Sequence, residues 1–541
     1  MNTRLPLLNP RWIFRIANDI SEYSLPTPNR SKKISIAHKT AAGAGWMILW
    51  RLATRVLGVL STLILAHVLV PQDFGVVAIA TTYVAAFDAI SAFGLQDAII
   101  KTSGSGEELH DTAFTLSIIR GAVNGAIVAA SAPLAAEFFN EPRVAAVLYV
   151  LAILALLEGF ENVGVVDFRR GLRFDKEFQL FLIPRLVSVA VTIICALIFR
   201  SYWALVIGTA VQRLIRLGAT YMLHPFRPRL SIAEWRQISS FSFWTWAASV
   251  ASFARDRSWT PIVGRFFNPT SVGTFSMAAD LGLLPSSELI YPICRALFSG
   301  FALARHEGVA LGPAFARTLG VVALVVLPAG IGISAIANYV VDLALGSRWS
   351  AAIPITQIIA ATGPFFLLTG IGGTIMNASG FVQSNFWIVS ISAVIGAAAN
   401  VFMAMRVGIN GVALATGLMM TFEGMLFLTI TARAVNASVG GILRCLWRPL
   451  LSTLIMAAIL LGAGYGWQTG RISGSNTSLE CVIAISIGAA TYIASLLILW
   501  RLSQDPDSPE LFLINFVRRS LRRSRDPTPD GQATDGITDQ F

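Results

Sequence analysis

The chain has 541 residues, of which 55% are hydrophobic and only 13% charged, and its mean hydropathy is +0.66. Soluble proteins carry about 25% charged residues, so this composition excludes an ordinary soluble domain and indicates a polytopic membrane protein. The net charge of +11 requires no nucleic-acid partner, because the orientation of a membrane protein accounts for it.

The stretch before Gly45 is polar and basic and lacks a small-residue cleavage site, so no export signal is expected there. Beyond it, apolar windows of about 20 residues predict an all-α chain of about 14 membrane spans. They lie near residues 46–69, 75–96, 112–135, 144–164, 178–199, 203–222, 238–260, 272–294, 317–341, 354–377, 384–405, 411–434, 446–466 and 481–500. The seventh and eighth are the least regular, since they contain charges and internal prolines.

A proline-to-glycine hinge joins the first span to the second and recurs between the seventh and eighth. The first copy runs from Pro71 to Gly75, and the second, 198 residues later, from Pro269 to Gly273. Coincidence is the alternative, because Pro and Gly occur in most short turns. A true repeat predicts two six-helix lobes in a parallel pseudo-two-fold arrangement, followed by two further helices. The predicted parts are a 1–44 N-terminal segment, a 45–222 N-lobe, a 223–434 C-lobe, a 435–502 pair of helices and a 503–541 tail.

Lys and Arg residues set the orientation of these spans. With a cytoplasmic N-terminus, 27 of the 41 lie on the cytoplasmic side, 6 on the outer side and 8 within spans. We therefore expect a multi-pass protein of the bacterial inner membrane with both termini in the cytoplasm and both hinges outside. The segments 11–20 and 511–517 have helical apolar spacing next to basic residues, which predicts interfacial helices on anionic membrane lipids. A disordered basic tail is the alternative for the second, and residues 526–541 are expected to be disordered.

The loops argue against an enzyme. The longest outer loop, residues 467–480, is too short to hold an acceptor and a set of catalytic residues. The five histidines are isolated and show no metal-ligand spacing, and the chain has no Walker motif for ATP. No catalytic residue, metal site or cofactor is predicted.

Arginines within the spans are the candidate substrate-binding residues, because each charge at membrane depth calls for a partner or a cavity. Arg51, Arg55 and Arg120 are predicted to line a cavity that opens to the cytoplasm and accepts a pyrophosphate group through bidentate guanidinium contacts. For Arg185, Arg213 and Arg216, side chains that extend to the inner membrane interface are the preferred interpretation.

The seventh span carries Arg255, Asp256 and Arg257 near its predicted outer end. Either arginine could serve as an outer phosphate site, although both cannot face one cavity squarely, and an internal ion pair with Asp256 is the alternative.

Acidic residues at depth admit two interpretations. Asp88, Asp256 and Glu423 are predicted to be counter-ions for the arginines or sites for a coupling proton or sodium ion, with the counter-ion role preferred. Four more acids lie within spans: Glu158, Glu161, Asp280 and Glu288.

Several segments resemble the bacterial polysaccharide transporters, the Wzx-type lipid-linked oligosaccharide flippases of the multidrug/oligosaccharidyl-lipid/polysaccharide superfamily. In the first half these are Gly45-Trp46, Arg51 and the runs 65–75 and 93–100; in the second they are Asp256 and the runs 262–266 and 272–278. The resemblance covers about residues 40–500, and its loose motifs identify a family better than a substrate.

The resemblance implies two six-helix lobes around a central cavity. It also implies translocation of an undecaprenyl-pyrophosphate-linked oligosaccharide repeat unit for exopolysaccharide, capsule or O-antigen synthesis. Polymerase and glycosyltransferases of the same pathway would be its partners. A cation-coupled multidrug antiporter of the same superfamily is the alternative, disfavoured because the inner half holds more arginines than acids; a polysaccharide polymerase or ligase is a third.

Overall fold

The computed structural model describes residues 53–92, 107–171, 173–234, 243–306, 311–378, 380–468, 477–503 and 509–510. Four features of the sequence lie outside these residues: Arg51, the segment 1–44, the run 93–100 and the tail from residue 511.

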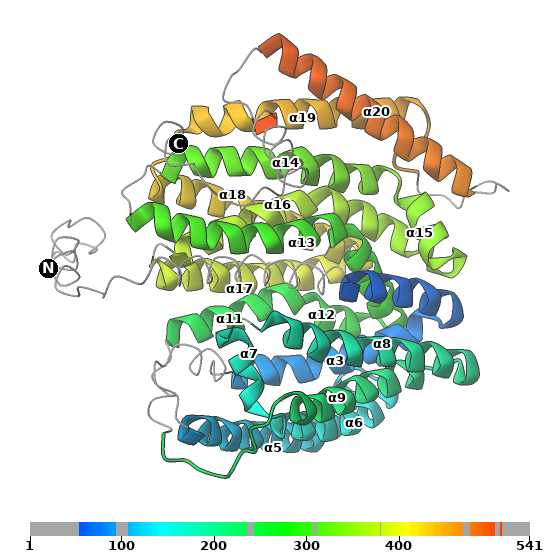
Figure 1. Ribbon diagram of the computed structural model, residues 1–541. Helices are drawn as coiled ribbons and strands as arrows, with labels where there is room; N and C mark the ends of the chain where they lie inside the picture. The colour runs from blue at the N-terminus through cyan, green and yellow to red at the C-terminus, as the bar shows by residue number, and fades with distance from the viewer. Residues whose placement is uncertain are drawn as a thin grey trace, which may run out of the picture.

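Long helices make up nearly all of the described chain, and no strand occurs in these residues (Figure 1). The first is Ala53–Val68. The others are α3 (Pro71–Ser91), α5 (Glu107–Phe138), α6 (Arg143–Gly159), α7 (Val166–Arg170), α8 (Phe174–Phe199), α9 (Trp203–Leu223), α11 (Phe243–Arg257), α12 (Trp259–Phe266), α13 (Pro269–His306), α14 (Leu311–Ala335), α15 (Ala337–Leu345), α16 (Ala352–Ala378), α17 (Val382–Arg406), α18 (Ile409–Ala434), α19 (Val439–Gly462) and α20 (Thr477–Ser503), with short 3-10 turns at Val163–Val165 and Ser347–Trp349.

The predicted spans coincide with these helices. Each of the fourteen windows overlaps one long helix, except that the seventh is divided into α11 and α12 at Ser258 and the ninth runs from α14 into α15. Within the described residues, nine helices are both long and apolar enough to cross a bilayer. The predicted all-α polytopic membrane fold is confirmed.

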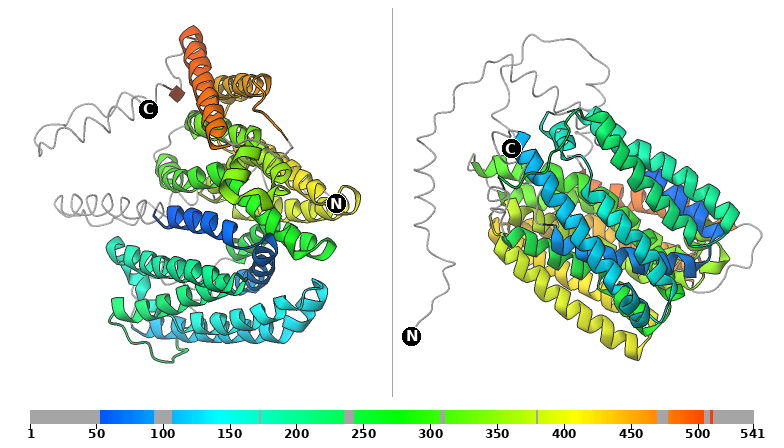
Figure 2. Two further views of the ribbon diagram at one scale, coloured as in Figure 1. Left: turned by 90° about the vertical axis from the view of Figure 1, so that its right-hand side faces the viewer. Right: turned by 90° about the horizontal axis from the view of Figure 1, so that it is seen from below.

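The helices form two groups that follow the order of the chain. In Figures 1 and 2 helices α5, α6, α8 and α9 pack together on one side, and α13, α14, α16 and α18 on the other, with α19 and α20 outermost. We call residues 53–223 the first half and residues 243–434 the second half. The hinge end of the bundle carries Pro71 and Pro269, and the linker end carries residues 224–234.

The two predicted hinges pack directly against each other. A side-chain carbon added at Gly75 would lie 1.7 Å from the carbonyl oxygen of Pro269, and one added at Gly273 would lie 1.9 Å from the carbonyl oxygen of Pro71. Each glycine thus touches the proline of the other copy, as expected for equivalent elements related by a two-fold axis. Only glycine leaves room for backbones this close.

The largest buried apolar cluster also lies at the hinge end and joins the two halves. It includes Leu69 and Phe74 from the first half and Phe275 and Trp349 from the second, all 7% exposed or less. The Trp349 indole packs edge-on against Phe74 at 5.3 Å and donates a hydrogen bond to the carbonyl of Ala66 at 3.0 Å. The hinge end is therefore sealed by a continuous core.

The linker end is organised differently. There the clusters formed by the described residues stay within one part of the chain, as around Leu109 and Val166 in the first half and around Phe315 and Ile371 in the second. The halves are thus joined most firmly at one end of the membrane bundle, which leaves space for polar cavities nearer the other.

Candidate functional site

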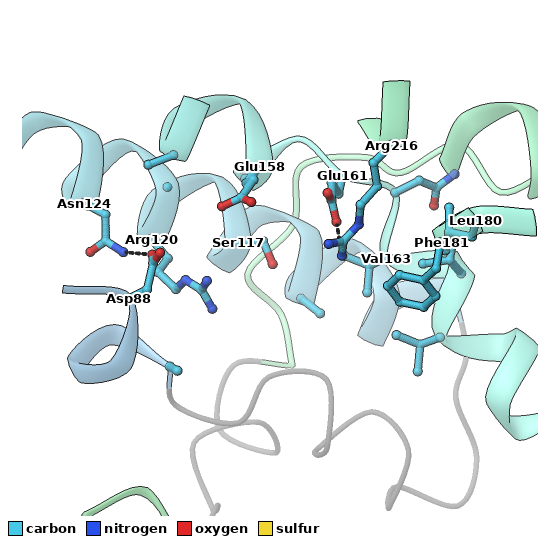
Figure 3. A pocket seen from close by; sticks show the side chains of 18 of the residues that line it. Asp88, Ser117, Arg120, Asn124, Glu158, Glu161, Val163, Leu180, Phe181 and Arg216 are labelled. Carbon is cyan, nitrogen blue, oxygen red and sulfur yellow. Dashed lines mark hydrogen bonds and ion pairs between the residues drawn. The ribbon is translucent and has the colours of Figure 1, made fainter. Parts of the chain in front are cut away.

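A polar cavity of about 520 Å³ lies in the first half, with one wall supplied by α11 of the second (Figure 3). Helices α3, α5, α6, α8 and α9 contribute its charged side chains, and Thr245, Trp246 and Ser249 contribute the wall from α11. The charged residues that line it are Asp88, Arg120, Glu158, Glu161, Glu177 and Arg216.

Two arginines of α9 bind acids at the end of α6 instead of extending to the interface. Arg213 forms an ion pair with Glu158 at 2.8 Å, and Arg216 forms one with Glu161 at 3.0 Å. The preferred interpretation of these two arginines as interfacial side chains was therefore wrong. An ion pair formed inside the protein lowers the cost of each charge at depth. The sequence could have suggested these pairs, because Glu158 and Glu161 have the same three-residue spacing as the two arginines.

Arg185 also turns inward, where it donates to Gln212 at 3.3 Å and contacts Gly58 of the first helix. It does not follow the interfacial interpretation either.

Arg120 is the cation of this cavity that remains available. It makes no hydrogen bond or ion pair with any described residue, although it lies within electrostatic range of Glu161. Nearby, Asn124 donates to the Asp88 carboxylate at 2.9 Å, which holds that acid against α5. Figure 3 shows Arg120 beside this pair, on the opposite side of the view from Glu161 and Arg216.

The balance of charge in the cavity corrects one argument from the sequence. Four acids and two arginines line it, so arginines do not dominate the charge around this space. The expectation from the sequence compared the numbers of arginines and acids in the inner half of the spans. It could not show that several of these arginines form ion pairs. Charge alone therefore does not separate an anionic substrate from a cationic one here.

A second charged group lies within the second half. Arg255 bridges the carboxylates of Asp256 at 2.8 Å and Glu423 at 2.6 Å, next to a cavity of about 80 Å³. The helix runs on through α12 to Phe266, so this triplet lies about 14 Å or more from the hinge end at 1.5 Å per residue. The helical run thus continues beyond the predicted end of the seventh span at residue 260, which places the triplet farther from the end of the helix than the sequence predicted.

Between the halves, Arg55 of the first helix forms an ion pair with Glu288 of α13 at 2.8 Å, with both side chains 42% exposed. Asp280, two helical turns nearer the hinge end on α13, lies within electrostatic range of Arg55 and Arg257. Arg55 is thus paired between the halves and is not among the described residues that line the polar cavity of Arg120.

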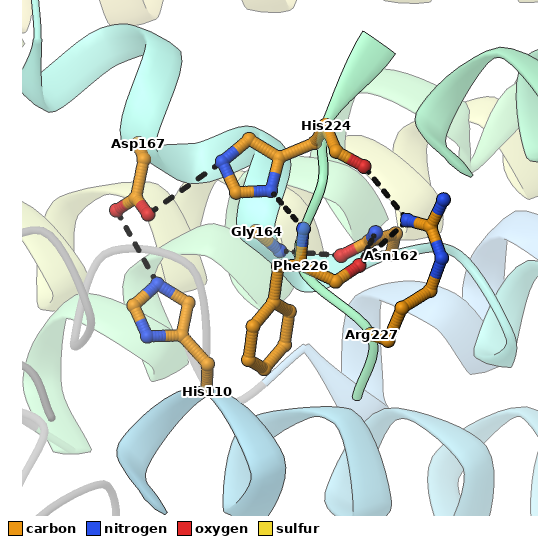
Figure 4. Close-up of polar contacts among 7 residues, drawn as sticks. All are labelled: His110, Asn162, Gly164, Asp167, His224, Phe226 and Arg227. Atoms are coloured by element: carbon orange, nitrogen blue, oxygen red, sulfur yellow. Dashed lines mark hydrogen bonds and ion pairs between the residues drawn. The ribbon is translucent and has the colours of Figure 1, made fainter. Parts of the chain in front are cut away.

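The histidines are isolated along the sequence, yet two of them share one carboxylate at the linker end (Figure 4). Asp167 of α7 lies 3.3 Å from Nε2 of His110 and 3.9 Å from Nε2 of His224. No group of three possible metal ligands occurs among the described residues. These contacts between residues 57 apart in sequence left no spacing signal that could have revealed them.

This cluster fastens the linker between the halves to the first half. The Asn162 amide donates to the carbonyl of Phe226 at 2.7 Å, and the Phe226 amide donates to Nδ1 of His224 at 3.2 Å. Further along, Asp111 and Thr115 of α5 accept hydrogen bonds from the backbone amides of Arg229 and Ser231. The linker is therefore a fixed strap across the first half.

Burial lowers the pKa of His224 below its ordinary value, and the nearby Asp167 carboxylate offsets this effect only in part. The unfolded chain then binds a proton that the folded chain does not, so stability present above about pH 6.5 should fall as the pH drops below it. We expect His224→Asn, which retains an acceptor for the Phe226 amide, to lose less thermal stability than the wild type between pH 7.5 and 5.5. If the melting temperatures of the variant and the wild type fall by the same amount between these two pH values, this assignment is contradicted.

The family of the chain follows from comparison with known proteins. Residues 64–354 match the family described as polysaccharide biosynthesis protein, which is more than half of the chain. The chain belongs to this family. It is 23% identical over 364 residues to the lipopolysaccharide biosynthesis protein WzxC of Escherichia coli, covering 65% of this chain and 73% of that protein. It is 25% identical over 328 residues to the succinoglycan biosynthesis transport protein ExoT of Rhizobium meliloti, covering 60% and 66%.

Solved structures agree on the architecture. The lipid II flippase MurJ in an inward closed conformation has a TM-score of 0.69 at 15% identity, covering 85% of this chain and all of that one. An inward-facing multidrug resistance transporter of the MATE family has a TM-score of 0.55 at 14% identity, covering 71% and 94%. At these identities the likeness shows the fold alone. The predicted membership of the polysaccharide transporter group is confirmed.

Proposed function

We propose that this polysaccharide biosynthesis protein translocates an undecaprenyl-pyrophosphate-linked oligosaccharide across the bacterial inner membrane. Family membership and the biosynthesis and transport names of its sequence relatives support a lipid-linked sugar over a drug. The structural observation that carries the proposal is the guanidinium of Arg120 in a polar cavity, which has no partner among the residues that the structure describes and could bind a pyrophosphate through charge-assisted hydrogen bonds.

In this proposal the linker end faces the cytoplasm and the hinge end faces outward, with both termini inside. The excess of Lys and Arg on one side of the sequence supports this orientation. The sealed hinge end then corresponds to a state closed to the outside. Residues 45–222 and 223–434 act as the two moving lobes, and residues 435–502 add the last two helices.

The same proposal assigns the remaining parts. The protein has no catalytic role, and the pathway's glycosyltransferases and polymerase act before and after it. Asp256 and Glu423 act mainly as counter-ions, because both are paired to Arg255. For Asp88, which the neutral amide of Asn124 holds beside Arg120, the counter-ion role is proposed from this proximity. A proton or sodium ion as the coupling ion is the second candidate role for these acids.

Substitution of Arg120 tests the substrate site. Hydrogen bonds to charged groups contribute about 1.5–3 kcal/mol, so we expect Arg120→Ala to weaken binding of the lipid-linked sugar about 10- to 100-fold. Arg120→Lys should recover part of this, since it keeps the charge but not the bidentate geometry. Translocation of a fluorescent lipid-linked sugar by the purified protein in vesicles measures the effect.

Arg501→Ala is the matched control, because Arg501 is exposed on α20. Normal translocation by a stably inserted Arg120→Ala variant would contradict the assignment of Arg120 as a substrate-binding residue. Accumulation of a cationic dye, with no movement of the lipid-linked sugar, would favour the multidrug antiporter.

A further inference from the structure

An apolar groove of about 910 Å³ lies between the halves, away from the polar cavity described above. Helix α3 of the first half forms one wall, and α11, α12 and α17 of the second form the other. Along α17 it extends from Ala393 to Met405, about 18 Å at 1.5 Å per residue. It therefore runs from the middle of the bundle toward the hinge end.

Small and large side chains together shape this groove. Ala86 and Ala397 recess its walls, whereas Val394, Phe402 and Met405 are more than half exposed along its rim. Such a surface suits a flexible hydrocarbon chain that enters from the side, because few of its side chains offer a polar contact.

Among the described residues that line the groove, Arg257 alone carries a charge. Its side chain is exposed and makes no hydrogen bond or ion pair with any described residue. It lies nine residues before the end of α12 at Phe266, about 14 Å from the hinge end. Its charge also reaches Asp280, so Arg257 connects the groove to the charged residues between the halves.

The depth of Arg257 discriminates between lipids. The hydrocarbon core of a bilayer is about 30 Å thick, so the backbone of a residue about 14 Å from one end of the span lies near its middle. The phosphate of an ordinary bilayer lipid stays at the surface and would not reach it. An anionic headgroup at this depth belongs to a lipid that is crossing the membrane.

We propose that this groove binds the polyisoprenoid chain of the lipid-linked substrate while its diphosphate lies near Arg257. The hydrocarbon chain of a lipid in the inner leaflet already points toward the outer leaflet. The chain can therefore lie in the groove, toward the hinge end, while the headgroup moves from the linker end to the middle of the membrane. The inference rests on the proposed function, and it adds a binding site for the chain and a position for the headgroup midway across.

Chain length provides the test. Ala397→Trp fills the groove, and we expect it to slow translocation of an undecaprenyl-pyrophosphate sugar at least tenfold while leaving a geranyl-pyrophosphate sugar nearly unaffected. Movement of the short substrate also shows that the variant is folded. Arg257→Ala should slow both substrates, because the headgroup is common to them. Ala490→Trp, at an exposed position on α20, is the control and should change neither rate.

An equal loss for both chain lengths in Ala397→Trp, or no loss for either, would overturn the proposal. Photolabelling tests the groove independently of transport, with a polyprenyl diphosphate that carries a photoreactive group at the far end of its chain. We expect label on α17 that Ala397→Trp removes. Label elsewhere, or equal labelling of α17 by a photoreactive phosphatidylglycerol, would refute a specific chain site. If the wild type labels α17 yet moves neither substrate, only the proposed function fails.

Discussion

Replacement of Gly75 or Gly273 by alanine is expected to force the hinge end open. The added methyl group would meet a backbone carbonyl of the opposite hinge at less than 2 Å, and a backbone atom at a helix start cannot rotate away as a side chain can. Overpacking of this kind costs about 1–3 kcal/mol, and each 1.4 kcal/mol changes an equilibrium about tenfold. The equilibrium constant for closing the hinge end should therefore fall several-fold to about 100-fold. Polysaccharide export should fall as the closed state becomes less populated.

The distance between spin labels at Glu137 and Ser350 would report the opening, because both residues are exposed at the hinge end and belong to opposite halves. We expect this distance to increase in either variant, measured after replacement of the four native cysteines. Gly218→Ala is the matched control, since nothing lies within 4 Å of a side-chain carbon at that helical position. An unchanged distance together with normal export would contradict a gate at this contact.

The reciprocity of the contact gives a sharper expectation. Once one alanine has separated the halves, the second has little left to disrupt. The double variant should therefore resemble the single variants, because substitutions that share one contact are not additive. Fully additive losses of thermal stability would mean that the two glycines act separately.

The hinges also show which part of the fold could be predicted from the sequence. The spacing of Pro71 and Gly75 and its recurrence at Pro269 and Gly273 predicted a repeat, because proline and glycine fix backbone geometry locally. Sequence did not predict that the two copies touch. That contact depends on how one half rotates against the other, which a pattern within each half does not contain.

The site was less accessible to prediction than the fold. Depth along a helix identified which arginines fall within predicted spans, since this follows from span length. It did not show which of them turn inward, because Arg185, Arg213 and Arg216 were expected at the interface and have partners inside the protein. Their partners depend on helix rotation and neighbours, so a pair between distant helices such as Arg55–Glu288 could not be predicted. Only the matching three-residue spacing of the two acids and the two arginines hinted at the pair Arg213–Glu158. Arg120 and Arg257 differ from them only in lacking a partner among the described residues, a property that no single position reveals.

The ion pair between Arg255 and Glu423 should be costly to break from one side. The Glu423 side chain is 5% exposed, so Arg255→Ala leaves a buried carboxylate without its cation. Loss of one partner of a buried pair costs about 3–5 kcal/mol, and we expect a large fall in the melting temperature of the purified protein. Glu423→Gln should cost much less, because Arg255 keeps Asp256 at 2.8 Å and an amide oxygen can still accept its hydrogen bond.

The double variant Arg255→Met with Glu423→Leu separates the penalty of an unpaired charge from the value of the pair itself. Apolar replacement of both partners is often neutral or stabilising, so the double variant should melt well above Arg255→Ala. Transport by Glu423→Gln then decides between the two roles of the acid. A counter-ion can be neutralised with its cation still held by Asp256, so export should continue in this variant. A stable Glu423→Gln protein that moves no substrate would instead make Glu423 the site where a coupling proton binds.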